Sequence, residues 1–303
     1  EKNHLPQKMT KWYFLCMGKK EKNTYTNNFS LLSGIFVIFV SLVSWFIVGP
    51  LLSYRLSSSK ILNSSSWSDF GRYFIVHVPY IMLFIALFFL SHFILRTSLK
   101  SLIAGCNRRY RWTYSFFVAF IYLAFLAIFS LMQIKGISVD ATPFSDKLKL
   151  VVPILILTPM QALSEEILFR ALPARLVFND RLEKNTLKSN LLIILSGVLF
   201  LIPHLKNPEV SSSFLFSSLY YFTWGSLAMA LSLWTDGFEA PVAMHIANNL
   251  YIALIVNYSG SSMPTHALFI NNRELSPISS LIEACIVFIA IFLFSLLMEK
   301  RKC

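Results

Sequence analysis

Long apolar runs separated by short polar stretches set the pattern of this 303-residue chain. A run of roughly 20 apolar residues is long enough to cross the hydrocarbon core of a bilayer as a helix. Inside a bilayer, backbone groups must find their hydrogen-bond partners within the segment, so helices are expected. The pattern predicts an all-α polytopic membrane protein with about eight transmembrane helices. The expected spans are residues 30–52, 74–95, 113–134, 151–178, 190–206, 212–234, 240–258 and 278–298.

No internal repeat and no long linker divides the chain, so one transmembrane helical domain is expected over residues 30–298. Residues 1–29 are polar and basic, with aromatic residues interspersed. They are interpreted either as a cytoplasmic tail or as a segment that lies in the membrane interface. Residues 299–303 form a second short tail, which is predicted to be cytoplasmic.

The composition agrees with a membrane protein: 55% of residues are hydrophobic and only 14% are charged. Soluble domains have about 25% charged residues. The net charge of +12 does not indicate nucleic-acid binding, because no soluble domain is present to carry a basic surface. Membrane lipid is the expected partner, since Lys and Arg mark cytoplasmic loops and anionic lipid surfaces.

The distribution of positive charge predicts the orientation in the membrane. With the N-terminus inside, the inner segments carry 18 Lys and Arg residues and the outer segments carry 8. By the positive-inside rule, both termini are predicted to be cytoplasmic. The predicted location is the cell membrane. Residue usage rich in Lys, Asn, Ser, Phe and Ile is typical of an AT-rich bacterial genome.

The run 151–178 contains two adjacent carboxylates and a guanidinium. Each charge at that depth costs roughly 2.5–3.5 kcal/mol, so the cluster indicates a functional site by default. Glu166 and Arg170 are one turn apart, in the order that favours an ion pair. Glu165 points about 100° away and is expected to have no local partner, which suits a general acid or base. The alternative is a structural ion-pair network that locks the helix.

Two later runs add polar groups. His204 follows Phe200 by four residues at the end of the fifth run. His245 and Asn249 lie one turn apart on one face of the seventh run, and Asn248 is expected to turn elsewhere. A glutamate, two histidines and an amide are the groups needed to activate water and to stabilise an oxyanion. His77 and His92, in the second run, are interpreted as structural residues.

Three motifs thus occur in order on three apolar segments: Glu165-Glu166-x-x-x-Arg170, Phe200-x-x-x-His204 and His245-x-x-x-Asn249. Together they resemble the motifs of the CPBP intramembrane proteases. That family groups CAAX prenyl endopeptidases of the Rce1 type with bacterial Abi and bacteriocin-processing proteins. The resemblance covers about residues 150–255, and it implies an intramembrane site between the fourth, fifth and seventh helices.

The resemblance also implies a role for each motif residue in a CAAX-like endopeptidase. Glu165 would be the general base that activates the attacking water, with His204 as its partner. His245 and Asn249 would hold the oxyanion of the tetrahedral intermediate. The substrate would be a membrane-associated peptide or protein tail, either a prenylated CAAX tail or a bacteriocin or pheromone-like leader. The supporting residues would be Glu166, Arg170 and Phe200.

A metal is an open question at this stage. The family is often described as metalloproteases, and Glu165, His204 and His245 match the donors of two-histidine-plus-glutamate Zn²⁺ sites. The same three residues are equally suited to act without a divalent metal.

Two other classes of function share some of these features. A non-catalytic immunity or scaffold protein on the same fold would tolerate decay of the motifs, yet every motif position is filled here. A proton-coupled transporter also places acids and histidines at mid-membrane. Such transporters typically show pseudo-repeated helices broken by Gly or Pro, and this chain has 10 Gly and no visible repeat.

The depths of the first two motifs conflict in a regular ladder of helices. On ideal helices that begin where the apolar runs begin, Glu165 and His204 would lie about 12 Å apart in depth. The gap closes if the fourth helix is tilted and extends to about Phe178. The fifth helix must also start later or turn back near Pro203. An irregular, tilted fourth helix is therefore predicted.

Overall fold

The structure is a computed structural model that describes residues 30–58, 68–104, 110–178, 182–184, 186–273 and 276–300. The predicted tail or interfacial segment at residues 1–29 lies outside the described residues. Of the predicted tail at 299–303, residues 299 and 300 are the end of the last helix and the others are not described.

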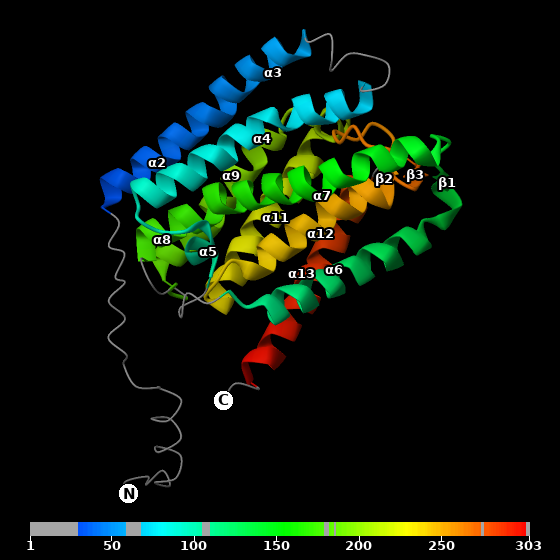
Figure 1. The fold of residues 1–303 in the computed structure, drawn as a ribbon. Coiled ribbons are helices and arrows are strands. Elements are labelled where there is room, and N and C mark those ends of the chain that lie inside the picture. The colour runs from blue at the N-terminus through cyan, green and yellow to red at the C-terminus, as the bar shows by residue number, and fades with distance from the viewer. Residues whose placement is uncertain are drawn as a thin grey trace, which may run out of the picture.

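Helices account for most of the described chain, and each of the eight predicted runs is helical over most of its length (Figure 1). The first run comprises two α-helices with a π-helical turn between them, and the fourth has the same composition. In chain order the helices are α2 (Leu31–Val43), η1 (Ser44–Val48), α3 (Gly49–Ser57), α4 (Ser68–Phe93), α5 (Leu99–Ile103), α6 (Trp112–Met132), η2 (Ile134–Gly136), α7 (Phe144–Glu166), η3 (Ile167–Ala171), α8 (Leu172–Phe178), α9 (Leu187–His204), α10 (Pro208–Ser212), α11 (Phe214–Thr235), α12 (Glu239–Leu254) and α13 (Pro277–Lys300).

Seven helices in the described part of the chain are long and apolar enough to cross a membrane. The predicted all-α polytopic membrane fold is confirmed, although the predicted number of eight spans is not. The difference lies in α12, which has only 16 residues. Most of its side chains are buried, and it packs against α6 and α7 inside the bundle. Hydropathy alone could not separate a buried core helix of this kind from a lipid-facing span.

A small sheet, absent from the sequence-based prediction, closes one end of the bundle (Figure 1). Its order is β1-β3-β2, with β1 (Ile137–Val139) antiparallel and β2 (Val256–Tyr258) parallel to β3 (Phe269–Asn271). Each strand has three residues, too few to show an alternating pattern. The sheet joins the segment between α6 and α7 to the segment between α12 and α13.

The irregularity predicted for the fourth helix is confirmed. The chain from Phe144 to Phe178 is continuously helical over 35 residues, with Pro153 and Pro159 inside α7 and the π-helical turn η3 directly after Glu166. A π-turn adds a residue to the helical repeat and is frequent at functional sites. The tilt of this fourth helix relative to a bilayer stays a prediction.

The depth conflict is reduced by the true ends of the two helices. From Phe178, Glu165 lies about 20 Å along its helix, and from Leu187, His204 lies about 26 Å along α9. The difference in depth between Glu165 and His204 is then about 6 Å. Of the two alternatives for the fifth helix, a later start is wrong, because Thr186 caps a first turn whose polar residues hydropathy left out. The helix contains Pro203 and ends at His204.

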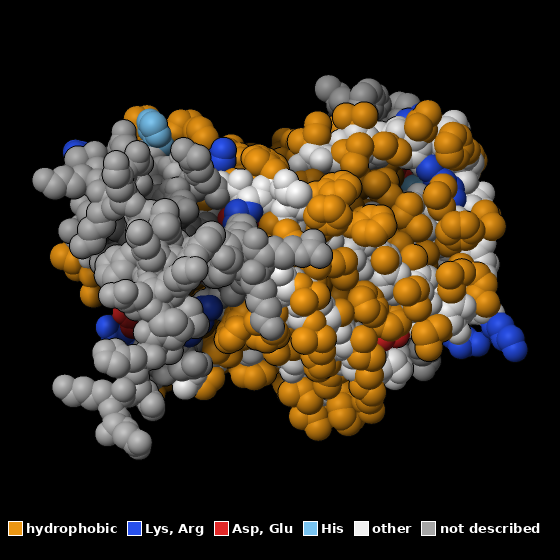
Figure 2. All heavy atoms as spheres, turned by 90° about the horizontal axis from the view of Figure 1, so that it is seen from below, with side chains coloured by type: hydrophobic (Ala, Val, Ile, Leu, Met, Phe, Trp, Pro, Cys, Tyr) orange, Lys and Arg blue, Asp and Glu red, His pale blue; other side chains and the backbone are white. Residues whose placement is uncertain are grey.

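The outer surface of the bundle is largely apolar. Leu32, Trp112 and Met132 are 80%, 69% and 76% exposed. In the face drawn in Figure 2, hydrophobic side chains predominate wherever described atoms are visible. Soluble monomers rarely expose contiguous apolar patches larger than a few hundred Å². Such a surface is suited to hydrocarbon, and the buried charges lie inside it.

Candidate functional site

The charge cluster lies at the junction of α7 and η3. Glu165 is 2% exposed, and Glu166 and Arg170 are fully buried. Arg170 Nη1 donates a hydrogen bond to Glu166 Oε1, so the predicted i,i+4 pair is confirmed. The π-turn places Arg170 in the interior beside its partner. Replacing one member of such a pair strongly destabilises the fold, because the other charge is then buried alone.

Glu166 has a second partner that the sequence did not reveal. His245 Nδ1 lies 2.8 Å from Glu166 Oε1, so α12 is linked to α7 at this point. A carboxylate only accepts hydrogen bonds, so Nδ1 carries the proton. His245 Nε2 then faces the other glutamate, 3.9 Å from Glu165 Oε2. His245 therefore lies between the two adjacent carboxylates.

The expectation that Glu165 has no local partner is wrong. Gln161 Nε2 donates to Glu165 Oε1 at 3.2 Å. Gln161 is one turn earlier on the same helix, at the same spacing as Glu166 and Arg170, so the sequence contained this information. Glu165 Oε2 has no hydrogen-bond partner among the described residues. One oxygen is thus fixed and the other is available.

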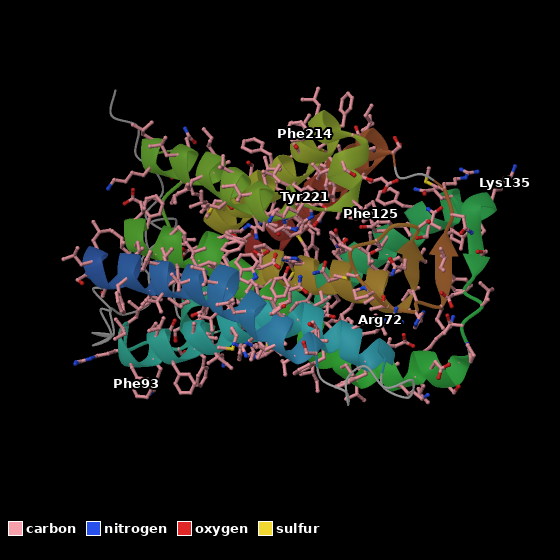
Figure 3. The ribbon with its side chains drawn as sticks, turned by 90° about the horizontal axis from the view of Figure 1, so that it is seen from above. Arg72, Phe93, Phe125, Lys135, Phe214 and Tyr221 are labelled. Carbon is pink, nitrogen blue, oxygen red and sulfur yellow. The ribbon has the colours of Figure 1, made fainter. Side chains whose placement is uncertain are left out.

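His204 is held at the end of α9 by its own helix. Its Nδ1 lies 2.6 Å from the carbonyl oxygen of Phe200, which leaves Nε2 as the free ring nitrogen. The imidazole stacks on the ring of Tyr221, with centroids 4.2 Å apart. Tyr221 comes from α11 and lies in the middle of the bundle (Figure 3). These contacts fix both the tautomer and the plane of His204.

Phe200 connects the three motifs through its ring. The ring centroid is 4.6 Å from that of His204 and 5.7 Å from that of His245. The guanidinium of Arg170 lies over the Phe200 ring at 4.7 Å and over the Trp224 ring at 5.1 Å. Cation–π contacts of this kind hold a charge in a dry environment. Trp224, which also touches His245 at 5.3 Å, belongs to no motif and was missed.

Asn249 is oriented by its neighbour in the sequence. Asn248 Nδ2 donates to Asn249 Oδ1 at 3.1 Å, and the Tyr122 hydroxyl donates to Asn248 Oδ1 at 3.1 Å. Asn248 thus bonds to α6, as expected for a residue turned away, but it also fixes the amide of Asn249. With Oδ1 engaged, the Asn249 NH₂ group is the remaining donor.

A cavity of about 440 Å³ contains the predicted catalytic groups. Glu165, His204, His245 and Asn249 all line it, whereas Glu166 and Arg170 are not among its lining residues. The structure therefore brings the predicted catalytic residues together and places the charged supporting pair behind them. Phe200 also lines the cavity.

His77 was interpreted as structural, yet it also lines this cavity. It is 2% exposed, and its Nδ1 lies 2.8 Å from the carbonyl oxygen of Tyr73. Its Nε2 has no hydrogen-bond partner among the described residues. Because no motif surrounds His77, no sequence pattern could place it near the fourth helix.

The possible metal donors, whose role the sequence left open, are Glu165, His204 and His245. In the part of the chain that the structure describes, no three His, Cys, Asp or Glu side chains are grouped to hold an ion. The Nδ1 atoms of His204 and His245 are engaged by Phe200 and Glu166. These contacts leave the two Nε2 atoms, and metal-binding histidines commonly have such Nδ1 partners. Within the described residues, however, Glu165, His204 and His245 line one cavity without forming a group that could hold an ion.

Comparison with known proteins agrees with the motifs. Residues 147–251 match the family model described as type II CAAX prenyl endopeptidase Rce1-like. This match confirms the resemblance and supports a CAAX-type intramembrane protease fold. The uncharacterized protein YyaK of Bacillus subtilis (strain 168) is 24% identical over 195 residues, which cover 62% of this chain and 62% of that relative. No solved structure matches the chain.

Proposed function

We propose that this chain is an integral membrane endopeptidase of the CPBP type. It hydrolyses a peptide bond in a membrane-associated peptide or protein tail. The observation that carries the proposal is the single cavity lined by Glu165, His204, His245 and Asn249, which come from three helices. The Rce1-like match over the same segment supports it.

In the proposed reaction, a water molecule lies between Glu165 Oε2 and His204 Nε2. Glu165 takes a proton from this water as the oxygen attacks the carbonyl carbon of the scissile bond. Gln161 holds the other carboxylate oxygen, so Oε2 stays directed at the water. The proton then passes to the leaving nitrogen as the C–N bond breaks. No covalent link between substrate and enzyme forms.

The oxyanion is proposed to lie near His245 and Asn249. The amide of Asn249 offers its NH₂ group, because Asn248 occupies the oxygen. His245 offers Nε2–H when both ring nitrogens carry protons, while Glu166 binds Nδ1–H. Donors of this type act where charge develops, and losing one costs about 10²- to 10³-fold in kcat.

The substrate is proposed to enter the cavity from the membrane, because lipid-facing helices surround the site. A prenylated CAAX tail and a bacteriocin or pheromone-like leader are the candidates. A location in the cell membrane with both termini in the cytoplasm remains part of the proposal. It requires that α12, although only 16 residues long, crosses the membrane inside the bundle as an eighth span.

The test is cleavage of candidate peptides by the purified full chain in liposomes. Prenylated CAAX peptides and membrane-bound leader peptides are offered, and products are identified by mass spectrometry. We expect wild type to cleave at least one class, and His204→Ala and Asn249→Ala to lose about 10²-fold or more in kcat. Asp146→Asn, on the exposed side of α7, is the matched control. Full activity in His204→Ala would overturn the mechanism.

A further inference from the structure

The cavity extends beyond the motif residues to the end of the bundle that the sheet closes. Its wall there is formed by polar residues of several elements, in contrast to the aromatic wall around Phe200. A polar pocket inside an apolar bundle is suited to a polar ligand, because uncompensated polar groups are costly to bury. The polar lining residues at this end include Gln133, Asn257, Asn271, Ser280 and Glu283.

Glu283, from the first third of α13, is the charged group of this polar end. Its side chain is held by a chain of hydrogen bonds between amide groups. Gln133 Nε2 donates to Glu283 Oε1 at 3.2 Å, and Asn271 Nδ2 donates to Gln133 Oε1 at 2.8 Å. The backbone amide of Arg273 donates to Asn271 Oδ1 at 3.1 Å. The backbone N–H can only donate, so the donor and acceptor of each following hydrogen bond are determined. The sheet therefore holds the Gln133 NH₂ group toward the Glu283 carboxylate.

No lysine or arginine of the described cavity wall balances this carboxylate. Among the described residues that line it, none is a lysine or an arginine. Lys135 points away from the bundle (Figure 3), and the side chain of Arg273 packs on Gly136. Glu283 makes no ion pair within the described residues, although it is half-buried in a membrane-spanning helix. Ionisable residues in such positions are rare and mark substrate sites.

The carboxylate lies within reach of the reaction centre. The ring centroid of Trp224 lies 5.3 Å from that of His245 and 5.7 Å from that of Phe288. Phe288 is therefore the α13 residue that lies at about the depth of the motif residues. Glu283 precedes Phe288 by five residues, which is about 7.5 Å along the helix toward the sheet. An extended peptide advances about 3.3 Å per residue. The separation corresponds to two or three substrate residues.

We propose that Glu283 is the specificity residue of a subsite for a basic side chain of the substrate. The subsite would take the ammonium of lysine or the guanidinium of arginine within about three residues of the scissile bond. Aromatic rings of the cavity wall, among them Tyr122, Phe129 and Tyr251, add cation–π attraction. The identity of the substrate as a peptide rests on the proposed function.

The experiment measures peptide binding separately from cleavage. The probe is a short palmitoylated, fluorescein-labelled peptide of Ala and Leu, in which a lysine is moved through the positions one at a time. Matching peptides carry norleucine instead. Fluorescence anisotropy gives the Kd in detergent for the full chain with Glu165→Gln and for the same chain with added Glu283→Gln. Asp146→Asn removes an acid on the exposed side of α7 and is the matched control.

We expect the lysine peptide to bind about tenfold more tightly than its norleucine match at one or two positions, as for one charge-assisted hydrogen bond. Glu283→Gln should abolish this preference, and Asp146→Asn should retain it. Glu283→Lys should prefer the peptide with glutamate at the same position. Equal binding of lysine and norleucine peptides, or a lysine preference that survives Glu283→Gln, overturns the proposal.

Cleavage by the wild-type chain, measured in parallel, separates this proposal from the proposed function. Lysine-dependent binding that needs Glu283, without cleavage of any probe, supports the subsite and contradicts the protease. Cleavage that is indifferent to lysine supports the protease and contradicts the subsite.

Discussion

At the residue scale, the adjacent glutamates have different environments. Glu166 accepts hydrogen bonds from Arg170 and His245 and is fully buried. Glu165 lines the cavity and is held by Gln161, and its other oxygen has no hydrogen-bond partner among the described residues. The spacing of Glu166 and Arg170 was sufficient to predict their pairing. The contact with His245 depends on how two distant helices pack, so no local pattern could show it.

Glutamine substitutions should separate the two roles. Glu166→Gln leaves Arg170 without its charge partner in the interior and should lower the free energy of unfolding by about 3–5 kcal/mol. Glu165→Gln removes a charge whose only ion-pair contact within the described residues is with His245 at 3.9 Å, and His245 is bound more closely by Glu166. The fold should therefore keep its stability while cleavage is lost. Denaturation in mild detergent checks both variants. Similar stability losses in the two would contradict this division.

Gln161 is expected to be a positioning residue for Glu165. Gln161→Leu removes the hydrogen bond to Oε1, which is worth roughly 10- to 100-fold when the acceptor is charged. We predict a loss of that size in kcat with little change in KM, measured on the best peptide substrate. A change confined to KM would mean that Gln161 contacts the substrate instead.

At the element scale, the apolar runs predicted the helices well because a bilayer permits few alternatives. Those runs could not predict the short length of α12, because a core helix and a lipid-facing helix have similar hydropathy. The three-strand sheet was also out of reach. Its strands are far apart in the sequence, and three residues carry too little pattern.

The sheet is tied to α7 by Lys147. Its ammonium donates to the carbonyl oxygens of Asp140 and Ala267 at 2.9 and 3.0 Å and lies 3.2 Å from Asp140 Oδ1. Partial burial raises the pKa of the Asp140 carboxyl, but hydrogen bonds from Thr142 and Lys147 outweigh it and hold the pKa below its ordinary value. The charged form of Asp140 therefore stabilises the folded state.

Because the folded pKa is depressed, this stabilisation is present above the unfolded value, about 3.9. It is lost as the pH falls through the lower folded value. We predict that the thermal midpoint of wild type, compared with that of Asp140→Asn, declines as the pH is lowered from 5 through about 4. Parallel curves for the two proteins over this range would show that Asp140 contributes nothing.

At the scale of the whole molecule, an apolar outer surface encloses a cavity with polar and charged groups. The motifs identified the cavity residues of α7, α9 and α12, because their chemistry is unusual in hydrocarbon. The contributions of Trp224, His77 and Glu283 depend on the packing of α4, α11 and α13 and could be found only in three dimensions. The orientation is a separate prediction from the positive charges.

Reporter fusions test that orientation. A green fluorescent protein at the C-terminus should fluoresce, and alkaline phosphatase at the same place should be inactive, because both termini are predicted to be cytoplasmic. Alkaline phosphatase inserted at residues 259–262, beside the sheet, should be active. The reverse pattern would invert the membrane topology without changing the site.

The central claim is that Glu165 activates the water that cleaves the peptide bond. The most direct measurement is the single-turnover cleavage rate of the best substrate peptide by wild type and by Glu165→Gln, each reconstituted in liposomes. We predict that the variant binds the peptide as wild type does and cleaves at least about 10²-fold more slowly, the lower end of the contribution of a general base. Cleavage by Glu165→Gln at the wild-type rate would contradict the account.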